Sequence, residues 1–403
     1  MRARRTLRGA LVLAVTALLA GPGALARADE GRCTFPADPI EERPWSLQRV
    51  LLDRLWQDTR GEGVLVAVID SGVDTVNPQL TDAVDPGLGA DFTPENPVED
   101  DTPPTTSRGD GTEDTVGHGT KVAGIIAARP HEDTGFVGIA PAATVVPVRQ
   151  NDAYGSGTVA SLALAVDHAV QSGAHIINIS QDSDEPLTDD SALKRAVDEA
   201  LAADVLVIAS TGNDGADGRS RETYPAAYEG VLAVAASDRN NERAPFSQAG
   251  DFVGIAAPGV DMVSTVPGGG QCVDHGTSFA APYVTGVAAL LRAKHPDRSA
   301  GAIAAQLQQT AERPGSGPDR YVGWGVVDPV RALTEDTGPI DAPAPDSAAA
   351  PAPAPDVPPL ATGESYDERA ERLGTYVVLA GLTLAAVLTG GALVLRDWRR
   401  RTR

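Results

Sequence analysis

The chain has 403 residues, a net charge of −22 and a hydrophobic content of 42%. This length is sufficient for one large domain or two domains of ordinary size. The acidic balance argues against a nucleic-acid partner, because binding to nucleic acid relies on basic patches.

Residues 1–28 have the pattern of a secretory signal peptide. A basic segment, Met1–Arg5, precedes an apolar stretch, Ala10–Ala20, and small residues permit cleavage after Ala26 or Ala28. The sequence therefore predicts export of the remainder of the chain.

An exported chain occupies a compartment in which disulfides persist. Cys33 and Cys272 are its two cysteines, and we expect them to pair, with two unpaired buried thiols as the alternative. Cys33 lies in an N-terminal extension, residues 29–60, which is too short to fold alone and is expected to pack on the main body.

The C-terminal part predicts a membrane anchor. Residues 334–372 form a Pro/Ala-rich linker, which we expect to be an extended spacer. Residues 373–395 are predicted to form a transmembrane helix, with a buried core helix as the alternative. Arginines follow in residues 396–403, so the positive-inside rule predicts a cytoplasmic tail and a large domain outside the membrane.

Residues 61–333 predict an α/β domain, a doubly wound and mostly parallel sheet with helices on both faces. Apolar runs with the length of buried strands alternate with segments of helical periodicity. The expected strands are 63–69, 144–148, 176–179, 205–209, 231–235 and 252–256, and the expected helices are 159–171, 192–203 and one that begins near residue 277.

Four polar residues occupy positions that favour catalysis. Asp70 follows the first strand, where open α/β sheets place their sites, and His118 stands between two glycines ahead of a helix. Asn213 follows another strand, and Ser278 begins an apolar helix whose free N–H groups favour a developing oxyanion. Each has an ordinary alternative: a turn former, a structural histidine, a turn asparagine and a helix N-cap.

Other polar clusters are weaker candidates. The acidic stretch 82–115 suits either a calcium site or a solvated surface insertion, and we favour the insertion because no ligand spacing stands out. His275 lies too close to Ser278 along the chain to approach it as a base. We predict no catalytic metal and no cofactor, and leave structural calcium open.

Taken together, the four segments resemble the subtilisin-like serine proteases, the subtilases. The resemblance covers roughly residues 47–333, in the order Asp, His, Asn, Ser. It rests on Val68-Ile69-Asp70-Ser71-Gly72-Val73, His118-Gly119-Thr120-Lys121-Val122-Ala123-Gly124, Thr211-Gly212-Asn213 and Gly276-Thr277-Ser278-Phe279-Ala280-Ala281-Pro282.

The resemblance implies a role for each residue. Ser278 is the nucleophile, His118 the general base and Asp70 its orienting carboxylate, while Asn213 and the Ser278 N–H form the oxyanion hole. Two segments are expected to bind an extended substrate: Tyr154, Gly155, Ser156 and Gly157 in the first, and Ser180 with Gln181 in the second. Gln181 and the two residues after it depart from the glycines common in the family, which leaves the first specificity pocket undefined.

The architecture is similar to that of the mycosins, membrane-anchored proteases of type VII secretion systems. This resemblance implies an endopeptidase that processes or supports the export of secreted substrates, with the membrane secretion complex as a partner. The alternatives are a general cell-surface protease and a scaffold in which proteolysis is secondary.

Overall fold

The computed structural model describes residues 33–94, 106–152, 157–183, 191–335, 338–346 and 363–402. The expected signal peptide, residues 153–156 and residues 347–362 of the expected linker lie outside these ranges. The chain divides into two compact units, residues 1–347 and 348–403, which are described separately.

The larger unit is built on a parallel sheet of seven strands, in the order β2-β3-β1-β4-β5-β6-β7. Its strands are β1 (Leu65–Asp70), β2 (Ala90–Asp91), β3 (Thr144–Arg149), β4 (Ile176–Ile179), β5 (Leu206–Ser210), β6 (Leu232–Ser237) and β7 (Ile255–Pro258). The predicted sheet is confirmed, and the short edge strand β2 is an addition that the sequence pattern did not indicate.

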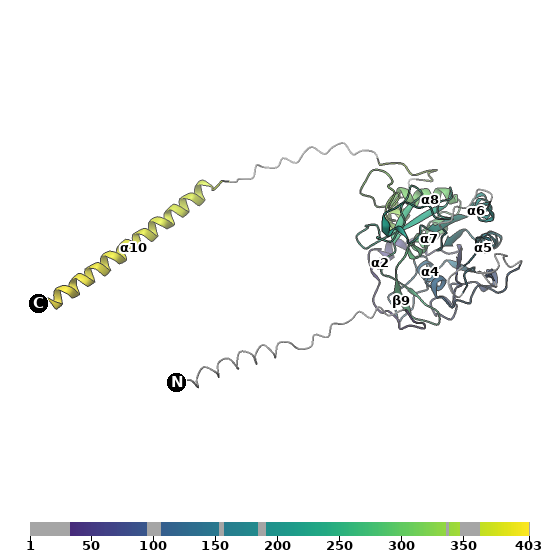
Figure 1. Cartoon of the computed structure of the whole chain (residues 1–403), viewed down its shortest axis with the longest axis horizontal. Coiled ribbons are helices and arrows are strands. Elements are labelled where there is room, and N and C mark those ends of the chain that lie inside the picture. Colours follow the sequence, from purple (N-terminus) through teal and green to yellow (C-terminus); the bar gives the residue numbers. More distant parts are fainter. Residues whose placement is uncertain are drawn as a thin grey trace, which may run out of the picture. The chain divides into compact units, whose positions relative to one another are not determined.

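Alternate residues of β1 face opposite sides of the sheet, as strand geometry requires. Val66 and Val68 belong to one buried cluster, and Ala67 and Ile69 belong to another. Helices α4 (His118–Ala127), α7 (Thr277–Lys294) and α8 (Ala300–Gln309) contribute to the first cluster, whereas α5 (Val159–Gln171) and α6 (Ala192–Ala202) contribute to the second (Figure 1). The sheet is therefore covered by helices on both faces, and α7 is buried over most of its length.

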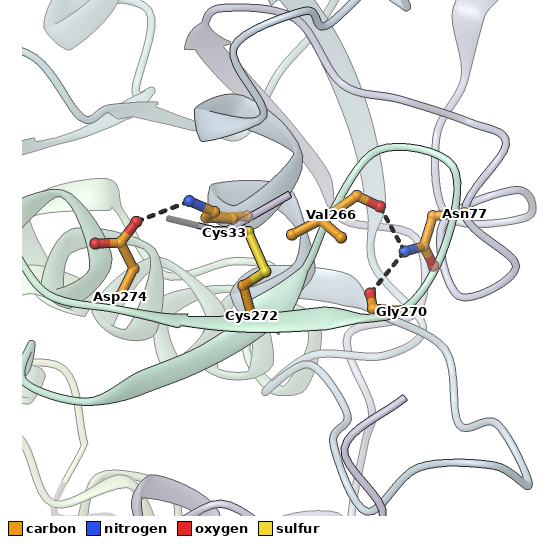
Figure 2. The surroundings of a disulfide bond; sticks show 7 residues. Cys33, Asn77, Val266, Gly270, Cys272 and Asp274 are labelled. Carbon is orange, nitrogen blue, oxygen red and sulfur yellow. Dashed lines mark hydrogen bonds and ion pairs between the residues drawn. A yellow bond between two sulfur atoms is a disulfide. The ribbon is translucent and has the colours of Figure 1, made fainter. Parts of the chain in front are cut away.

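A two-stranded antiparallel ribbon packs against α4. Its strands are β8 (Met262–Thr265) and β9 (Gln271–Asp274), which were not predicted although the glycine-rich segment between them is typical of a hairpin turn. Asn77 holds this turn by donating from Nδ2 to the carbonyl oxygens of Val266 (2.9 Å) and Gly270 (3.2 Å) (Figure 2).

The predicted disulfide is confirmed. Cys33 and Cys272 are bonded, with Cα atoms 5.9 Å apart across a sequence separation of 239 residues (Figure 2). The start of the described chain is thereby tied to β9.

The N-terminal extension packs on the main body through two short helices, α2 (Trp45–Gln48) and α3 (Leu52–Leu55). Leu47 and Leu55 are buried in the core. The Trp56 indole donates to the carbonyl of Ile139 at 2.8 Å. This extension is therefore part of the folded unit.

Residues 338–346, within the expected linker, contact the same unit. Asp346 accepts two hydrogen bonds from Arg313, at 3.0 and 2.9 Å, and the Ala344 N–H donates to the Gln309 side chain at 2.7 Å. These contacts lie beside α8 and the helix α9 (Pro329–Thr334).

The smaller unit contains one long helix, α10 (Tyr366–Arg401). Ser365 and Glu368 form a capping box at its N-terminus, and arginines lie in its last turn. None of its residues is buried, and it is long and apolar enough to cross a membrane.

Candidate active site

Asp70 and His118 meet at the carboxyl end of the central strand. Asp70 is the last residue of β1, His118 is the first residue of α4, and His118 Nδ1 lies 2.8 Å from Asp70 Oδ1. A carboxylate only accepts hydrogen bonds, so Nδ1 carries the proton and Nε2 is left to act as a base. Asp70 is fully buried, while the His118 side chain is 30% exposed and can therefore meet a substrate.

The surroundings of His118 raise its pKa above the ordinary value. Burial by itself would lower this pKa, but the charge and hydrogen bond of Asp70 raise it by more. Because the folded pKa is raised, the interaction stabilises the fold below about pH 6.5, the usual histidine pKa. That stabilisation is lost as the pH rises through the raised pKa.

A second buried carboxylate, Asp114, joins the strand end to the histidine helix. It accepts hydrogen bonds from Ser71 Oγ (2.9 Å), the Gly117 N–H (2.7 Å) and the Thr120 N–H (3.0 Å). Ser71 Oγ in turn accepts from the Gly119 N–H at 3.0 Å. The expectation of a solvated insertion is wrong at Asp114, which is only 8% exposed. The donors offset part of the cost of burying its charge, and burial still raises the pKa of Asp114 above its ordinary value.

Gly119 directly follows His118, and close contact between the backbone of α4 and the segment that follows β1 explains why this residue is a glycine. A Cβ atom on Gly119 would lie 2.1 Å from the carbonyl oxygen of Gly72. A side chain at residue 119 would therefore separate α4 from the end of β1.

Ser278 is the second residue of α7, as expected, and is 9% exposed. Pro282 lies four residues later and has no N–H to donate to the Ser278 carbonyl. Ser180, directly after β4, supplies the missing donor through its hydroxyl, at 3.0 Å. The first turn of α7 is thus fixed to the sheet.

Asn213 lies beside the start of α7. Its side-chain oxygen accepts from the Thr277 N–H (2.9 Å) and the Thr277 hydroxyl (3.1 Å). Because the oxygen is engaged, the amide nitrogen is the end that can donate to a developing oxyanion. Gly212 N–H also donates to the Thr277 hydroxyl, at 3.2 Å.

Phe279 brings the serine helix to the histidine. Its ring centroid lies 5.4 Å from that of His118, and it directly follows Ser278. The structure therefore gathers the ends of β1, β4 and β5 with the first turns of α4 and α7, at one edge of the sheet.

Only part of the expected substrate-binding set is described. Tyr154, Gly155 and Ser156 lie outside the described residues. Gln181 donates from Nε2 to Gln150 Oε1 at 2.6 Å, and a Cβ on Gly157 would lie 2.0 Å from Gln150 Nε2. Gln150, which the sequence did not single out, therefore separates the two expected binding segments.

Sequence reasoning also missed several residues that support the site. The sequence motifs contain Thr277 and Pro282 without indicating a separate role for either, and the acidic composition around Asp114 predicts a solvated loop. Their signals were present: a carboxylate three residues before the helix N-cap Gly117, and a proline four residues after the serine.

Comparisons with known proteins agree with this arrangement. A protein-family model described as "Subtilase family" matches residues 61–325 of this chain. Mycosin-1 of Mycolicibacterium smegmatis is 32% identical over 418 residues, spanning 91% of this chain and 87% of its own length. Subtilisin Savinase of Lederbergia lenta is 40% identical over 274 residues, spanning 68% and 93%.

The solved structure of MycP1 from the ESX-1 type VII secretion system is also similar. It has a TM-score of 0.66 and 31% identity, covering 77% of this chain and 90% of that one. The structure of MycP3 from the ESX-3 system has a TM-score of 0.63 and 34% identity, covering 75% and 90%. The chain belongs to the subtilase family: it is a subtilisin-like serine endopeptidase related to the mycosins.

Proposed function

We propose that Asp70, His118 and Ser278 form the catalytic triad of this endopeptidase. The observation that carries the proposal is the contact of His118 Nδ1 with the buried Asp70 carboxylate, beside the Phe279 ring that follows Ser278. The Nδ1 contact leaves Nε2 free to act as the base, and the start of α7 lies beside the imidazole ring through Phe279.

In the proposed reaction, Ser278 Oγ attacks the peptide carbonyl while His118 Nε2 takes its proton. The imidazolium is stabilised by Asp70 and returns the proton to the leaving amine, which departs as the acyl-enzyme forms. Water then attacks the ester, again with His118 as base, and releases the carboxylic acid and free Ser278.

The oxyanion of each tetrahedral intermediate is bound by Asn213 Nδ2 and the Ser278 N–H. Thr277 supports this role because it engages the side-chain oxygen of Asn213 and so turns the amide nitrogen outward. Donors fixed before the reaction stabilise developing charge without reorganising.

We propose that the substrate is an extended polypeptide bound between Tyr154–Gly157 and Ser180–Gln181. Gln150 supports this proposal because it lies between the two segments, bonded to Gln181 and close to the backbone of Gly157. Backbone pairing of this kind tolerates many side chains.

We further propose that the catalytic unit faces the outside of the cell membrane, that α10 is its single span, and that residues 396–403 are cytoplasmic. Arginines at the end of α10 and acidic residues at its start support this orientation. A solved relative, MycP1, is described as an essential component of the type VII (ESX-1) secretion system. We propose a corresponding role here: processing or supporting the export of type VII substrates in association with the membrane complex.

A fluorophosphonate probe tests the triad. We expect one adduct, on Ser278, in the full-length membrane-bound chain, and no adduct in Ser278→Ala or His118→Ala. Labelling of a different serine, or undiminished labelling of His118→Ala, would remove the assigned residues from their roles.

Export assays then separate the proposed role from a scaffold. We expect Ser278→Ala to stop substrate processing in cells while the folded protein remains in the membrane. If export and substrate maturation both continue unchanged in Ser278→Ala but fail when the whole chain is deleted, bracing a complex is the principal role. Processing of unrelated surface proteins in preference to exported ones would indicate a general surface protease.

A further inference from the structure

Lys121 is a buried cation one helical turn after His118. The residue is 8% exposed, and its Nζ lies 2.7 Å from Asp274 Oδ2. Asp274 ends β9, 153 residues further along the chain. Lysine is seldom buried without a partner, because desolvating its charge is unfavourable.

The Lys121–Asp274 pair lies near His118, the proposed base. Residues three apart on a helix share a face, so Lys121 lies on the His118 side of α4. The Phe279 ring contacts both: its centroid is 5.4 Å from the His118 ring and 6.0 Å from Lys121 Nζ. Because Lys121 is 8% exposed, water screens its charge less than the charge of a surface lysine.

The charged groups around the first turns of α4 come from several elements. Within the described ranges, β8 presents the uncharged Ser264 and Thr265, which donate to carbonyls of α4, and the nearby start of α7 presents Phe279. His275, after β9, packs on Phe246. The charged side chains are Asp70 of β1, Arg149 of β3, Asp274 of β9, and Asp74, Glu113 and Asp114 of the connecting loops.

Three of these groups, Arg149, Glu113 and Asp74, are engaged by partners other than His118. Arg149 pairs with Glu113 at 2.9 Å, and the Asp74 carboxylate accepts from the backbone N–H groups of Asn77 and Gly268. Asp274 is paired with Lys121. Asp70 and Asp114 remain as the negative charges that act on the imidazole, and Lys121 is the positive charge that opposes them. The pKa of His118 responds to all three, with Lys121 acting downward.

We propose that Lys121, held by Asp274, is a positioning residue that sets the pH at which His118 becomes a neutral base. The proposal rests on the proposed role of His118. Two buried carboxylates favour the imidazolium, which cannot accept the serine proton. A fixed cation opposes them, so the base is available at lower pH than the carboxylates alone would permit.

Replacing Lys121 and replacing Asp274 should shift the titration of His118 in opposite directions. Lys121→Met removes the cation and leaves Asp274 unpaired, so the imidazolium is favoured and His118 should titrate at higher pH. Asp274→Asn leaves the cation uncompensated, so His118 should titrate at lower pH. Both shifts should be about 0.5–1 pH unit, the size expected for the loss of one charge near a partly buried group.

Two matched controls accompany these variants. Lys121→Arg keeps the charge and should leave the titration within about 0.2 unit of the parent value. The double variant Lys121→Met/Asp274→Asn removes the cation together with its partner, so His118 should titrate above the parent value but by less than in Lys121→Met alone. A purely structural role for Lys121 would lower stability and rate in every variant without producing opposite shifts.

The titration can be measured without activity. The full-length chain carrying Ser278→Ala, labelled at histidine Cε1, is titrated by NMR in detergent micelles, and the His118 resonance is assigned by its loss in His118→Gln. The pH dependence of fluorophosphonate labelling is followed in parallel in chains that retain Ser278.

Each outcome bears on one proposal. Opposite shifts of the His118 resonance, matched by the labelling profiles, support the role of Lys121. Shifts of the same sign, or none, in variants with unchanged circular dichroism overturn it even if labelling proves the protease active. Opposite shifts in the resonance with a labelling profile that does not follow them would support the charge coupling and remove His118 as the base.

Discussion

At the scale of single residues, the proposed site depends on which atoms of His118 and Asn213 remain free after the other polar atom of each side chain has formed its hydrogen bonds. Asp70 accepts a hydrogen bond from Nδ1 of His118, which leaves Nε2 as the proposed base. Thr277 donates to the side-chain oxygen of Asn213, which leaves the amide nitrogen as the proposed oxyanion donor. In both proposed roles, a neighbouring residue determines which atom is free to act.

Replacing Asp70 by Asn should reduce kcat by about 10⁴, because the amide no longer selects the reactive tautomer or stabilises the imidazolium. The acidic limb of kcat/KM should also move to lower pH. Removing the Asp70 charge withdraws the main effect that raises the pKa of His118 and leaves burial, which lowers it. Steady-state rates between pH 4 and 9 measure both; a limb that moves upward would contradict the assigned coupling.

Replacing Asn213 by Ala should lower kcat by about 10²–10³ with little change in KM, since the lost hydrogen bond forms mainly in the transition state. Kinetics with a peptide ester and a peptide amide provide the measurement. Thr277→Val is the matched variant: it keeps the backbone N–H but loses the hydroxyl that helps to orient Asn213, and should cost less. An effect confined to KM would place Asn213 in ground-state binding instead.

At the scale of elements, the central contact is between the first turn of α7 and the end of β4. Pro282 leaves the carbonyl of Ser278 without a helical partner, and the Ser180 hydroxyl replaces it. Asn178 and Thr285 extend this connection, because Asn178 donates to Ser180 at 2.9 Å and accepts from Thr285 at 2.9 Å. A proline inside a buried helix is thus compensated from the neighbouring strand.

Ser180→Ala should lower the free energy of unfolding by about 1–3 kcal/mol, because a buried carbonyl loses its donor. Denaturant unfolding measures the change. In a Pro282→Ala background the loss should be smaller, since residue 282 regains an N–H that can bond to the Ser278 carbonyl. Equal losses in the two backgrounds would show that the two sites are independent.

At the scale of the whole molecule, distant segments are joined beside the site. The disulfide ties Cys33 to Cys272, two residues before Asp274, and Asp274 pairs with Lys121 of α4. Further along the chain, residues 338–346 contact the catalytic unit through Arg313. The segments that flank the catalytic unit in sequence are therefore partly integrated with it.

Replacing both cysteines by serine should lower the free energy of unfolding by about 3–5 kcal/mol, since the bond restrains a long loop in the unfolded chain. Thermal unfolding of the oxidised protein and of the double variant measures this. The single variants Cys33→Ser and Cys272→Ser should match the double variant. If the double variant is as stable as the parent, the disulfide does not contribute to stability, and the folded contacts of the N-terminal extension hold it in place without the bond.

The sequence alone determined those features that depend on local pattern. Strand and helix alternation and the apolar C-terminal helix follow from periodicity and composition, which are properties of short segments, and the export signal is predicted on the same basis. The order of Asp70, His118, Asn213 and Ser278 was enough to suggest the chemistry.

Only the tertiary structure decided the features that depend on contacts between distant segments. The β8–β9 ribbon, the burial of Asp114 and the Lys121–Asp274 pair involve groups whose environment is set by chain folding, not by their neighbours in sequence. A charged residue looks the same in the sequence whether it is solvated or buried. Its partner, and therefore its energy and its effect on the base, are established only when the chain has brought the two groups together.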